Sequence, residues 1–310
     1  MATRLFTFVQ MELPWALGPA DGRYLLRGKG GPSDGEPEHV VVLSTVGAER
    51  RHLLGRRART REAGSEPAAV LLARATIVDP VPLSAESQAS AWLRQLDPER
   101  ESQTAASVLN RVLFAHRIAG ASPHIHEISP AQALVVRAGF GEGEQVADGL
   151  WIAARELLLS RQRAHRRASV LRPQERLAVL LSGRGEALLC EELALRTRLD
   201  LDQGRVRHAA IELERAYAAA LGELPSEQRE DLKERIGQLE GLSPDVEKAA
   251  RAAMPAATPP ADVRSETAAH GAGEQTGAQE EPDEAFVRHA LERLEAALRA
   301  RTATGFASRS

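Results

Sequence analysis

The pattern of hydrophobic and polar residues changes character near residue 84. Before it, runs rich in β-branched, aromatic and leucine residues alternate with segments rich in glycine and proline; the runs cover residues 5–13, 22–28, 38–47 and 68–78. Short apolar runs bounded by turn residues are typical of β-strands. Because the connections show no helical pattern, we expect antiparallel neighbours and a small sheet with one covered face.

After residue 84 the apolar residues recur every three or four positions, which is the period of an amphipathic helix. Ser84 is the expected N-cap of a first helix. Asp97 and Pro98 then begin a second helix, which ends at Gly120. The second helix has an apolar stripe that needs a packing partner. The pattern therefore predicts an α+β domain over residues 1–160, in which a mainly antiparallel sheet packs against helices.

Residues 161–253 are predicted to form a helical region. Two helical patterns meet there at Gln203 and Gly204, which predicts a helical hairpin. The spacing resembles one unit of a tetratricopeptide-type hairpin. Stable arrays of that type need about three units, and only one is visible, so the hairpin does not define a family.

The end of the chain combines a polar segment with one more helical pattern. Residues 254–283 are rich in Pro, Ala, Gly, Thr and Glu and contain almost no large apolar side chain, which predicts a disordered linker. Residues 284–301 are predicted to form a C-terminal amphipathic helix. Its apolar stripe consists of Val287, Leu291, Leu294 and Leu298. Such a stripe must dock on its own chain, on a second copy or on another protein, and we take it as the candidate partner-docking site.

The amino-acid composition limits which cellular compartments and which classes of function fit this protein. The formal net charge of -3 argues against a uniformly basic nucleic-acid binder, and 4% aromatic residues leave few platforms for base stacking. Nearly all the positive charge is arginine, which is typical of GC-rich bacterial coding. Cys190 is the single cysteine, so no intramolecular disulfide is possible and a reducing compartment fits. Because no signal peptide or bilayer-spanning run is visible, we expect a cytoplasmic protein without membrane insertion.

Three glycines, Gly139, Gly141 and Gly143, alternate directly after an apolar run and are a candidate phosphate-binding loop. The full dinucleotide pattern is absent, because Val146 stands at the third glycine position and no P-loop lysine follows. Glu142 would also repel an anion bound there. This segment is therefore a weak case for an enzyme with a phosphate site.

The residues before these glycines suggest a structural alternative. Ser129, Pro130 and Gln132 have the spacing of a helix-capping box with proline at the first helical position. This pattern predicts that residues 131–138 form a helix and that Gly139 is its left-handed C-terminal stop. We prefer this interpretation to phosphate binding.

His124 and His126 are a candidate metal pair. In an extended segment, alternate side chains share a face, so both imidazoles could reach one ion. A third ligand is missing locally. The preferred interpretation is a pair of partly exposed loop histidines, and we expect neither a metal nor a cofactor.

Two arginine-rich runs are a candidate nucleic-acid site, because guanidinium groups neutralise phosphates. The candidate residues are Arg50, Arg51, Arg56, Arg57, Arg59 and Arg61 in the first run, and Arg163, Arg166 and Arg167 in the second. The alternative is that both runs are solvated surface segments.

Three functional hypotheses remain. The first is an interaction or adaptor protein with a tethered docking helix that binds a protein partner or a second copy. The second is a nucleic-acid-associated protein that uses the arginine runs, and the third is an enzyme that uses the glycine segment. Because no nucleophile signature is visible, the sequence favours a protein that is not an enzyme.

Overall fold

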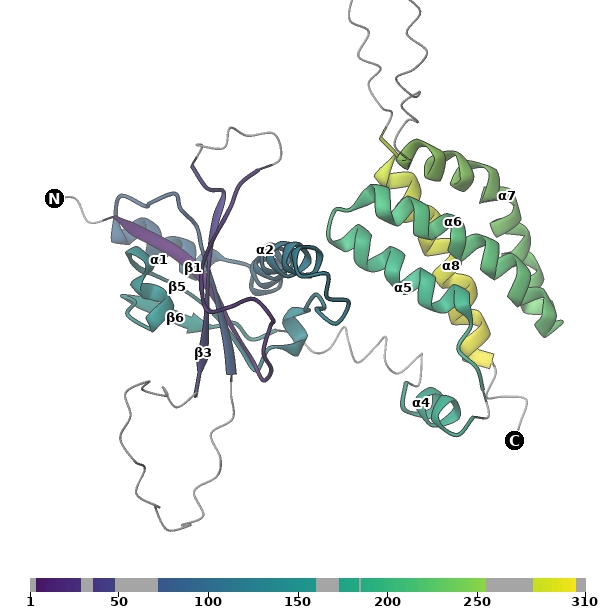
Figure 1. Cartoon of the computed structure of the whole chain (residues 1–310), viewed down its shortest axis with the longest axis horizontal. Helices are drawn as coiled ribbons and strands as arrows, with labels where there is room; N and C mark the ends of the chain where they lie inside the picture. The colour runs from purple at the N-terminus through teal and green to yellow at the C-terminus, as the bar shows by residue number, and fades with distance from the viewer. Residues whose placement is uncertain are drawn as a thin grey trace, which may run out of the picture. The chain divides into compact units, whose positions relative to one another are not determined.

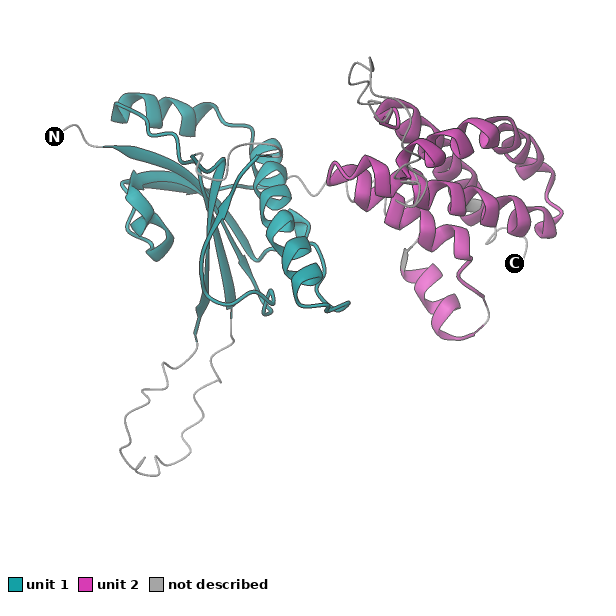
Figure 2. Ribbon diagram, turned by 45° about the horizontal axis from the view of Figure 1, so that its top comes forward, with its two compact units in different colours: residues 1–161 teal, residues 162–310 magenta. Residues whose placement is uncertain are grey.

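The computed structural model describes residues 4–28, 36–47, 72–159, 173–183, 185–254 and 281–304. The chain divides into two compact units, residues 1–161 and residues 162–310 (Figure 2). The first unit contains an antiparallel sheet with helices, and the second contains helices among its described residues. The predicted α+β class is confirmed. Most of the predicted linker, residues 255–280, lies outside the described residues.

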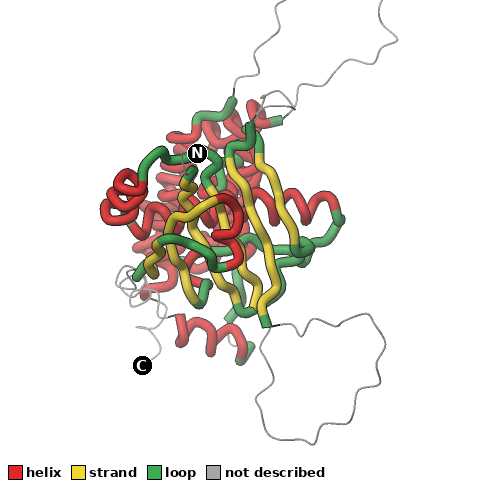
Figure 3. The backbone as a smooth tube through the Cα atoms, turned by 90° about the vertical axis from the view of Figure 1, so that its left-hand side faces the viewer, coloured by secondary structure: helices red, strands yellow, loops and turns green. Residues whose placement is uncertain are grey.

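A six-stranded sheet forms the centre of the first unit (Figure 3). Its strands are β1 (Leu5–Leu13), β2 (Gly22–Leu26), β3 (His39–Val46), β4 (Leu72–Val78), β5 (Val135–Glu142) and β6 (Ala153–Glu156). Their order is β2-β3-β4-β1-β5-β6, and every neighbouring pair is antiparallel. The first four strands lie within the runs predicted from sequence, which confirms the expected antiparallel sheet.

Side chains pack against both faces of the sheet, whereas the sequence predicted one covered face. On one face, Val9 and Met11 of β1 pack in a core with helices α1 (Glu86–Gln95) and α2 (Pro98–Ala119). On the other face, Phe8 packs with Val146 of the 3₁₀ helix η2 (Gly143–Asp148). The ring of Phe8 also stacks on Trp151, with the ring centroids 5.6 Å apart. Alternation of side chains along β1 therefore supplies both cores.

The predicted helix starts were partly right. Asp97 caps α2, because its carboxylate accepts hydrogen bonds from the backbone N–H of Glu99 at 3.0 Å and of Arg100 at 3.3 Å. Ser84, in contrast, does not cap α1. Its N-cap is Ala85, without a side-chain bond, and the Ser84 hydroxyl instead bonds the Gln88 side chain at 3.1 Å.

The helix predicted over residues 131–138 is wrong. The capping box at Ser129 forms, but it caps only one turn, the 3₁₀ helix η1 (Pro130–Gln132). The chain then enters β5, which pairs with β1 over the whole of its length and with β6 on its other side. Pairing with two strands satisfies more backbone groups than the local cap does, so tertiary contacts override the helical start signal.

Gly139 is consequently a strand residue and not a left-handed helix stop. A Cβ atom at this position would lie 2.4 Å from the Ala153 carbonyl oxygen and 2.8 Å from the Phe8 ring. Glycine is therefore required here by the close approach of β6 and Phe8 to the strand.

The second unit contains α4 (Pro173–Leu181), α5 (Leu189–Asp202), α6 (Val206–Glu223), the 3₁₀ helix η3 (Leu224–Glu227), α7 (Glu230–Ala253) and α8 (Glu284–Thr304) (Figure 1). Helices α5 and α6 form the predicted hairpin, which turns at Gln203 and Gly204. Gly204 has a φ of 67° there, a conformation that glycine adopts without strain. One hydrophobic core includes buried residues of α5, α6, α7 and α8.

Candidate protein-interaction site

Helix α8 packs against α5, α6 and α7 of its own unit. Val287, Leu291 and Leu294 are fully buried in the helical core, and Leu298 is partly buried against it. Three of the four predicted docking residues are therefore core residues in this arrangement. The stripe is docked on its own chain, which is one of the three partners that the sequence left open.

A buried hydrogen bond joins α8 to α6. The Tyr217 hydroxyl donates to the Ala290 carbonyl oxygen at 2.8 Å, and both residues are at most 1% exposed. Burial raises the pKa of Tyr217 well above its usual value, so the phenol stays protonated and remains a donor.

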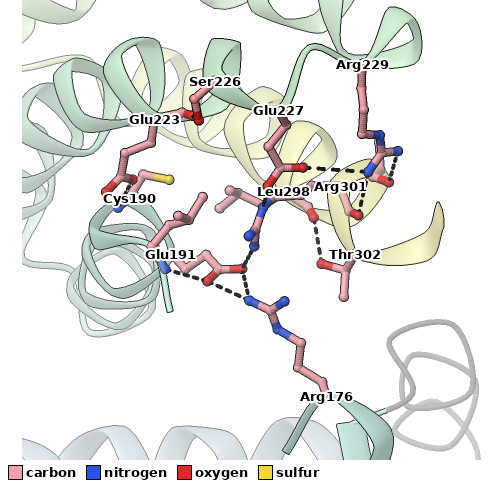
Figure 4. Close-up of polar contacts among 12 residues, drawn as sticks. Arg176, Cys190, Glu191, Glu223, Ser226, Glu227, Arg229, Leu298, Arg301 and Thr302 are labelled. Carbon is pink, nitrogen blue, oxygen red and sulfur yellow. Dashed lines mark hydrogen bonds and ion pairs between the residues drawn. The ribbon is translucent and has the colours of Figure 1, made fainter. Parts of the chain in front are cut away.

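Charged side chains surround the C-terminal end of α8 and form what we call the arginine clamp: Arg176, Glu191, Glu227, Arg229 and Arg301 (Figure 4). Arg301 pairs with Glu191 at 3.0 Å and also with Glu227. Arg229 donates to the carbonyl oxygens of Arg301 at 2.8 Å and Ala300 at 3.1 Å, so it caps the last turn of α8.

The same clamp connects α4 to α5. The Arg176 guanidinium donates to both carboxylate oxygens of Glu191, at 2.8 and 2.9 Å. Glu191 thus receives arginines from α4 and from α8. The Arg301 side chain is only 13% exposed, so removing either carboxylate would leave this poorly solvated charge with one acidic partner instead of two.

The N-terminus of α5 is capped by a carboxylate from α6. Glu223 accepts hydrogen bonds from the backbone N–H of Leu189 at 3.0 Å and of Cys190 at 3.1 Å. Burial works to raise the pKa of Glu223, but bonds from the Cys190 thiol and these backbone groups lower it below its usual value. Burial, together with Glu223, raises the pKa of Cys190 to about 12. The thiol is therefore neutral and is a poor nucleophile.

Other leucines of the helical unit remain exposed. Helix α4 exposes Leu177 by 47% and Leu181 by 79%, and α5 exposes Leu195 by 72% and Leu199 by 39%. Each pair is four residues apart, so its members lie on the same side of their helix. We call these four residues the leucine surface. Pairs of exposed apolar side chains on one side of a helix are typical of protein-binding sites.

The structure gives the glycine segment a packing role. Gly139 pairs with Phe8 on one side and with Ala154 on the other, so its strand is engaged in two ladders. A Cβ atom at Gly141 would lie 2.8 Å from Val146 and 3.0 Å from Trp151. Gly143 begins η2, where the neighbouring Glu144 pairs with Arg23 at 2.6 Å. Paired strand backbone does not offer the converging N–H groups that cradle a phosphate.

The two candidate metal ligands, His124 and His126, are exposed in the segment after α2. Within the described ranges, no group of three or more His, Cys, Asp or Glu side chains could hold a metal ion. The nine arginines proposed for nucleic-acid binding cannot be placed. They fall in residues 48–71 and 160–172, outside the described part of the chain.

The sequence matches no known protein-family model, and no curated protein or solved structure is similar to it. The class of protein is therefore defined by the fold alone, an α+β unit joined to a helical unit. None of the helices in the described ranges is long and apolar enough to cross a membrane.

Sequence reasoning missed both the arginine clamp and the leucine surface. Arg301 and Glu191 of the clamp are 110 positions apart, so no local spacing could reveal the clamp. The leucine surface did leave a signal, since Leu195 and Leu199 are one helical turn apart. Only the packing of α5 shows that this turn faces away from the core.

Proposed function

We propose that this protein is a protein–protein adaptor whose helical unit binds an amphipathic helix of a partner protein through the leucine surface. The observation that carries this proposal is the exposure of the side chains of α4. None of the described side chains of this nine-residue helix is buried, although the helix contains Leu177, Val179, Leu180 and Leu181. Its apolar side chains are available to a partner.

The short length of α4 strengthens the argument. Isolated helices shorter than about 12–15 residues are marginal in water, and packing of an apolar face usually stabilises them. Here the ion pair between Arg176 and Glu191 ties α4 to α5. Burying Leu177 and Leu181 against a partner would contribute about 1.5–3 kcal/mol for each side chain.

The arrangement of the leucine surface favours a helical partner. Leucines at i and i+4 on each helix form the ridges that a second helix packs between. The exposed ion pair of Glu192 and Arg196 lies on the outer side of α5, next to Leu195. A partner helix with an apolar stripe and charged flanks therefore complements this surface.

Helix α8 contributes to this function as a support for α5. Full burial of Val287, Leu291 and Leu294 contributes about 1.5–3 kcal/mol each, whereas closing a connection of about 30 residues costs about 3 kcal/mol. The gain from burial therefore exceeds the cost of closing the connection, and α8 docks on its own chain. Exchange of α8 between two copies would compete with an effective concentration on the order of millimolar, so micromolar protein keeps α8 on its own chain.

We place the adaptor in the cytoplasm, because its single cysteine is a buried, neutral thiol that needs no oxidising compartment. A reducing environment leaves this packing unchanged.

Affinity capture with the full chain from cells that contain it tests the proposal. We compare wild type with the double variant Leu177→Gln and Leu181→Gln, which keeps a helix-forming residue at both positions. The control is Ala178→Gln, which introduces the same side chain at an exposed position of α4. Wild type and control should retain a partner that the double variant loses, with thermal unfolding unchanged in all three proteins.

Size-exclusion chromatography with light scattering distinguishes a foreign partner from a second copy. A mass that rises with concentration in wild type and the control, but not in the double variant, would identify the second copy as the partner. Identical capture profiles together with identical masses for all three proteins would refute a role for α4.

A further inference from the structure

A cleft of about 240 Å³ lies in the α+β unit, remote in sequence from the leucine surface and not used by the proposed function. Its floor is formed by apolar side chains of the sheet and of α2: Val9, Ile77, Ala105 and Val108, all of which are buried. The start of β1, the start of β3 and the end of β4 meet at this cleft, because the strands are antiparallel. Three strands therefore bring polar residues to the same place.

The mouth of the cleft is polar and acidic. It is lined by His39 at the start of β3, Asp79 directly after β4, and Glu101 and Thr104 of α2. Burial lowers the pKa of His39; Arg111 lowers it further, while Glu38 and Asp79 raise it. The imidazole is consequently neutral near pH 7, and the charge that the lining presents is that of two carboxylates.

Thr7 brings a hydroxyl group to the cleft. It is 8% exposed and lines the cleft, and its hydroxyl has no hydrogen-bond partner in the part of the chain that the structure describes. The hydroxyl oxygen is not among the fully buried polar atoms that lack a partner, so it is open to the cleft. A ligand in the cleft can therefore reach this hydroxyl and form a hydrogen bond with it.

Trp92 of α1 forms a further part of the wall. A cation over an indole ring is attracted by the ring quadrupole, by about 0.5–2 kcal/mol. An aromatic ring, two carboxylates and a free hydroxyl around an apolar floor are the complement of one chemical class, an ammonium group attached to a short apolar body.

We propose that this cleft binds a small organic ammonium ion. The ammonium group lies between Asp79 and Glu101, donates to the Thr7 hydroxyl and faces Trp92, while its apolar body contacts Val9 and Val108. A metal ion fits less well, since within the described residues no three acidic, histidine or cysteine side chains are close enough to bind one.

Isothermal titration of the full chain with 2-phenylethylammonium tests this proposal, with neutral 2-phenylethanol and anionic 3-phenylpropionate as matched probes. For a ligand of this size we expect a Kd on the order of 0.1–1 mM for the ammonium ion. The alcohol should bind at least about tenfold more weakly, because it lacks the charge that the carboxylates recognise. The carboxylate probe should not bind.

Two variants locate the site. Glu101→Gln removes a charge from the mouth, and Thr7→Val removes the hydroxyl with little change in shape; each should weaken ammonium binding by about five- to tenfold. The control Glu99→Gln makes the same charge change two residues away, outside the cleft lining, and should alter the Kd by less than about twofold.

Three results would overturn the proposal. They are the absence of saturable ammonium binding up to about 10 mM, equal affinity for ammonium and alcohol, and unchanged affinity in both Glu101→Gln and Thr7→Val. Thermal unfolding of each variant verifies that the protein remains folded.

Discussion

At the scale of single residues, two positions show how one side chain, or its absence, controls the packing of a whole segment. At Gly139, a hydrogen in place of a Cβ lets β6 and Phe8 approach the strand. At Glu223, one carboxylate satisfies the first backbone donors of α5 and is stabilised in its charged form by them. Neither role depends on a bound ligand.

Gly139→Ala should destabilise the α+β unit by about 1–3 kcal/mol, because the new methyl group meets backbone and ring atoms that cannot move independently. Chemical denaturation followed by circular dichroism measures the change. Gly237→Ala is the control: it lies within α7 with open space around it and should stabilise the protein by up to about 1 kcal/mol. A neutral Gly139→Ala variant would contradict the packing role.

Glu223→Gln should lower the stability of the helical unit at neutral pH, and the difference from wild type should vanish in acid. The folded-state pKa of Glu223 lies below its unfolded value of about 4.3, so the unfolded state binds more protons. The stabilisation is therefore complete above about pH 5 and is lost as the pH falls through the folded pKa. Denaturation at a series of pH values measures it. A difference that grows in acid would contradict this sign.

At the scale of elements, α8 and α4 contrast with each other. Both are amphipathic helices joined to the hairpin by the arginine clamp, in which Glu191 receives Arg176 from one and Arg301 from the other. Helix α8 buries three of the four residues of its apolar stripe, whereas α4 has no buried residue among its described side chains. Helix α8 is therefore part of the core, and α4 is the element on which the proposed interaction rests.

Leu291→Ala in α8 should destabilise the helical unit by about 2–5 kcal/mol, because Leu291 is fully buried and its truncation leaves a cavity in the core. The matched control, Leu195→Ala in α5, removes the same atoms from a side chain that is 72% exposed and should change stability by less than about 0.5 kcal/mol. Equal effects of the two substitutions would show that α8 does not dock as described.

At the scale of the whole molecule, the chain contains two units with separate hydrophobic cores. Leu109 belongs to the core of the α+β unit and Leu291 to that of the helical unit, and no described residue is shared between the two clusters. Each unit has the length of an ordinary single domain, which is enough to bury a core of its own.

Differential scanning calorimetry should consequently resolve two transitions. Leu291→Ala should lower the midpoint of one transition, and Leu109→Ala should lower the midpoint of the other. Each substitution should reduce the free energy of unfolding by about 2–5 kcal/mol, which lowers the midpoint by about 4 °C or more. One transition that both substitutions shift equally would show that the two units unfold as a single cooperative body.

The sequence by itself determined the features that depend on neighbouring residues. The strand at residues 5–13, the Asp97–Pro98 start of α2 and the turn at Gly204 were all predicted, because each rests on local composition or backbone preference within a few positions. The apolar stripe of α8 was visible for the same reason.

The tertiary structure alone decided which segments meet. It turned residues 135–138 into a strand, since pairing with β1 and β6 outweighs the local cap at Ser129, and it placed α8 against α5, α6 and α7. The arginine clamp and the cleft between the sheet and α2 likewise join residues far apart in the chain. Such contacts follow from the free energy of burial and pairing over the whole fold, which no local pattern records.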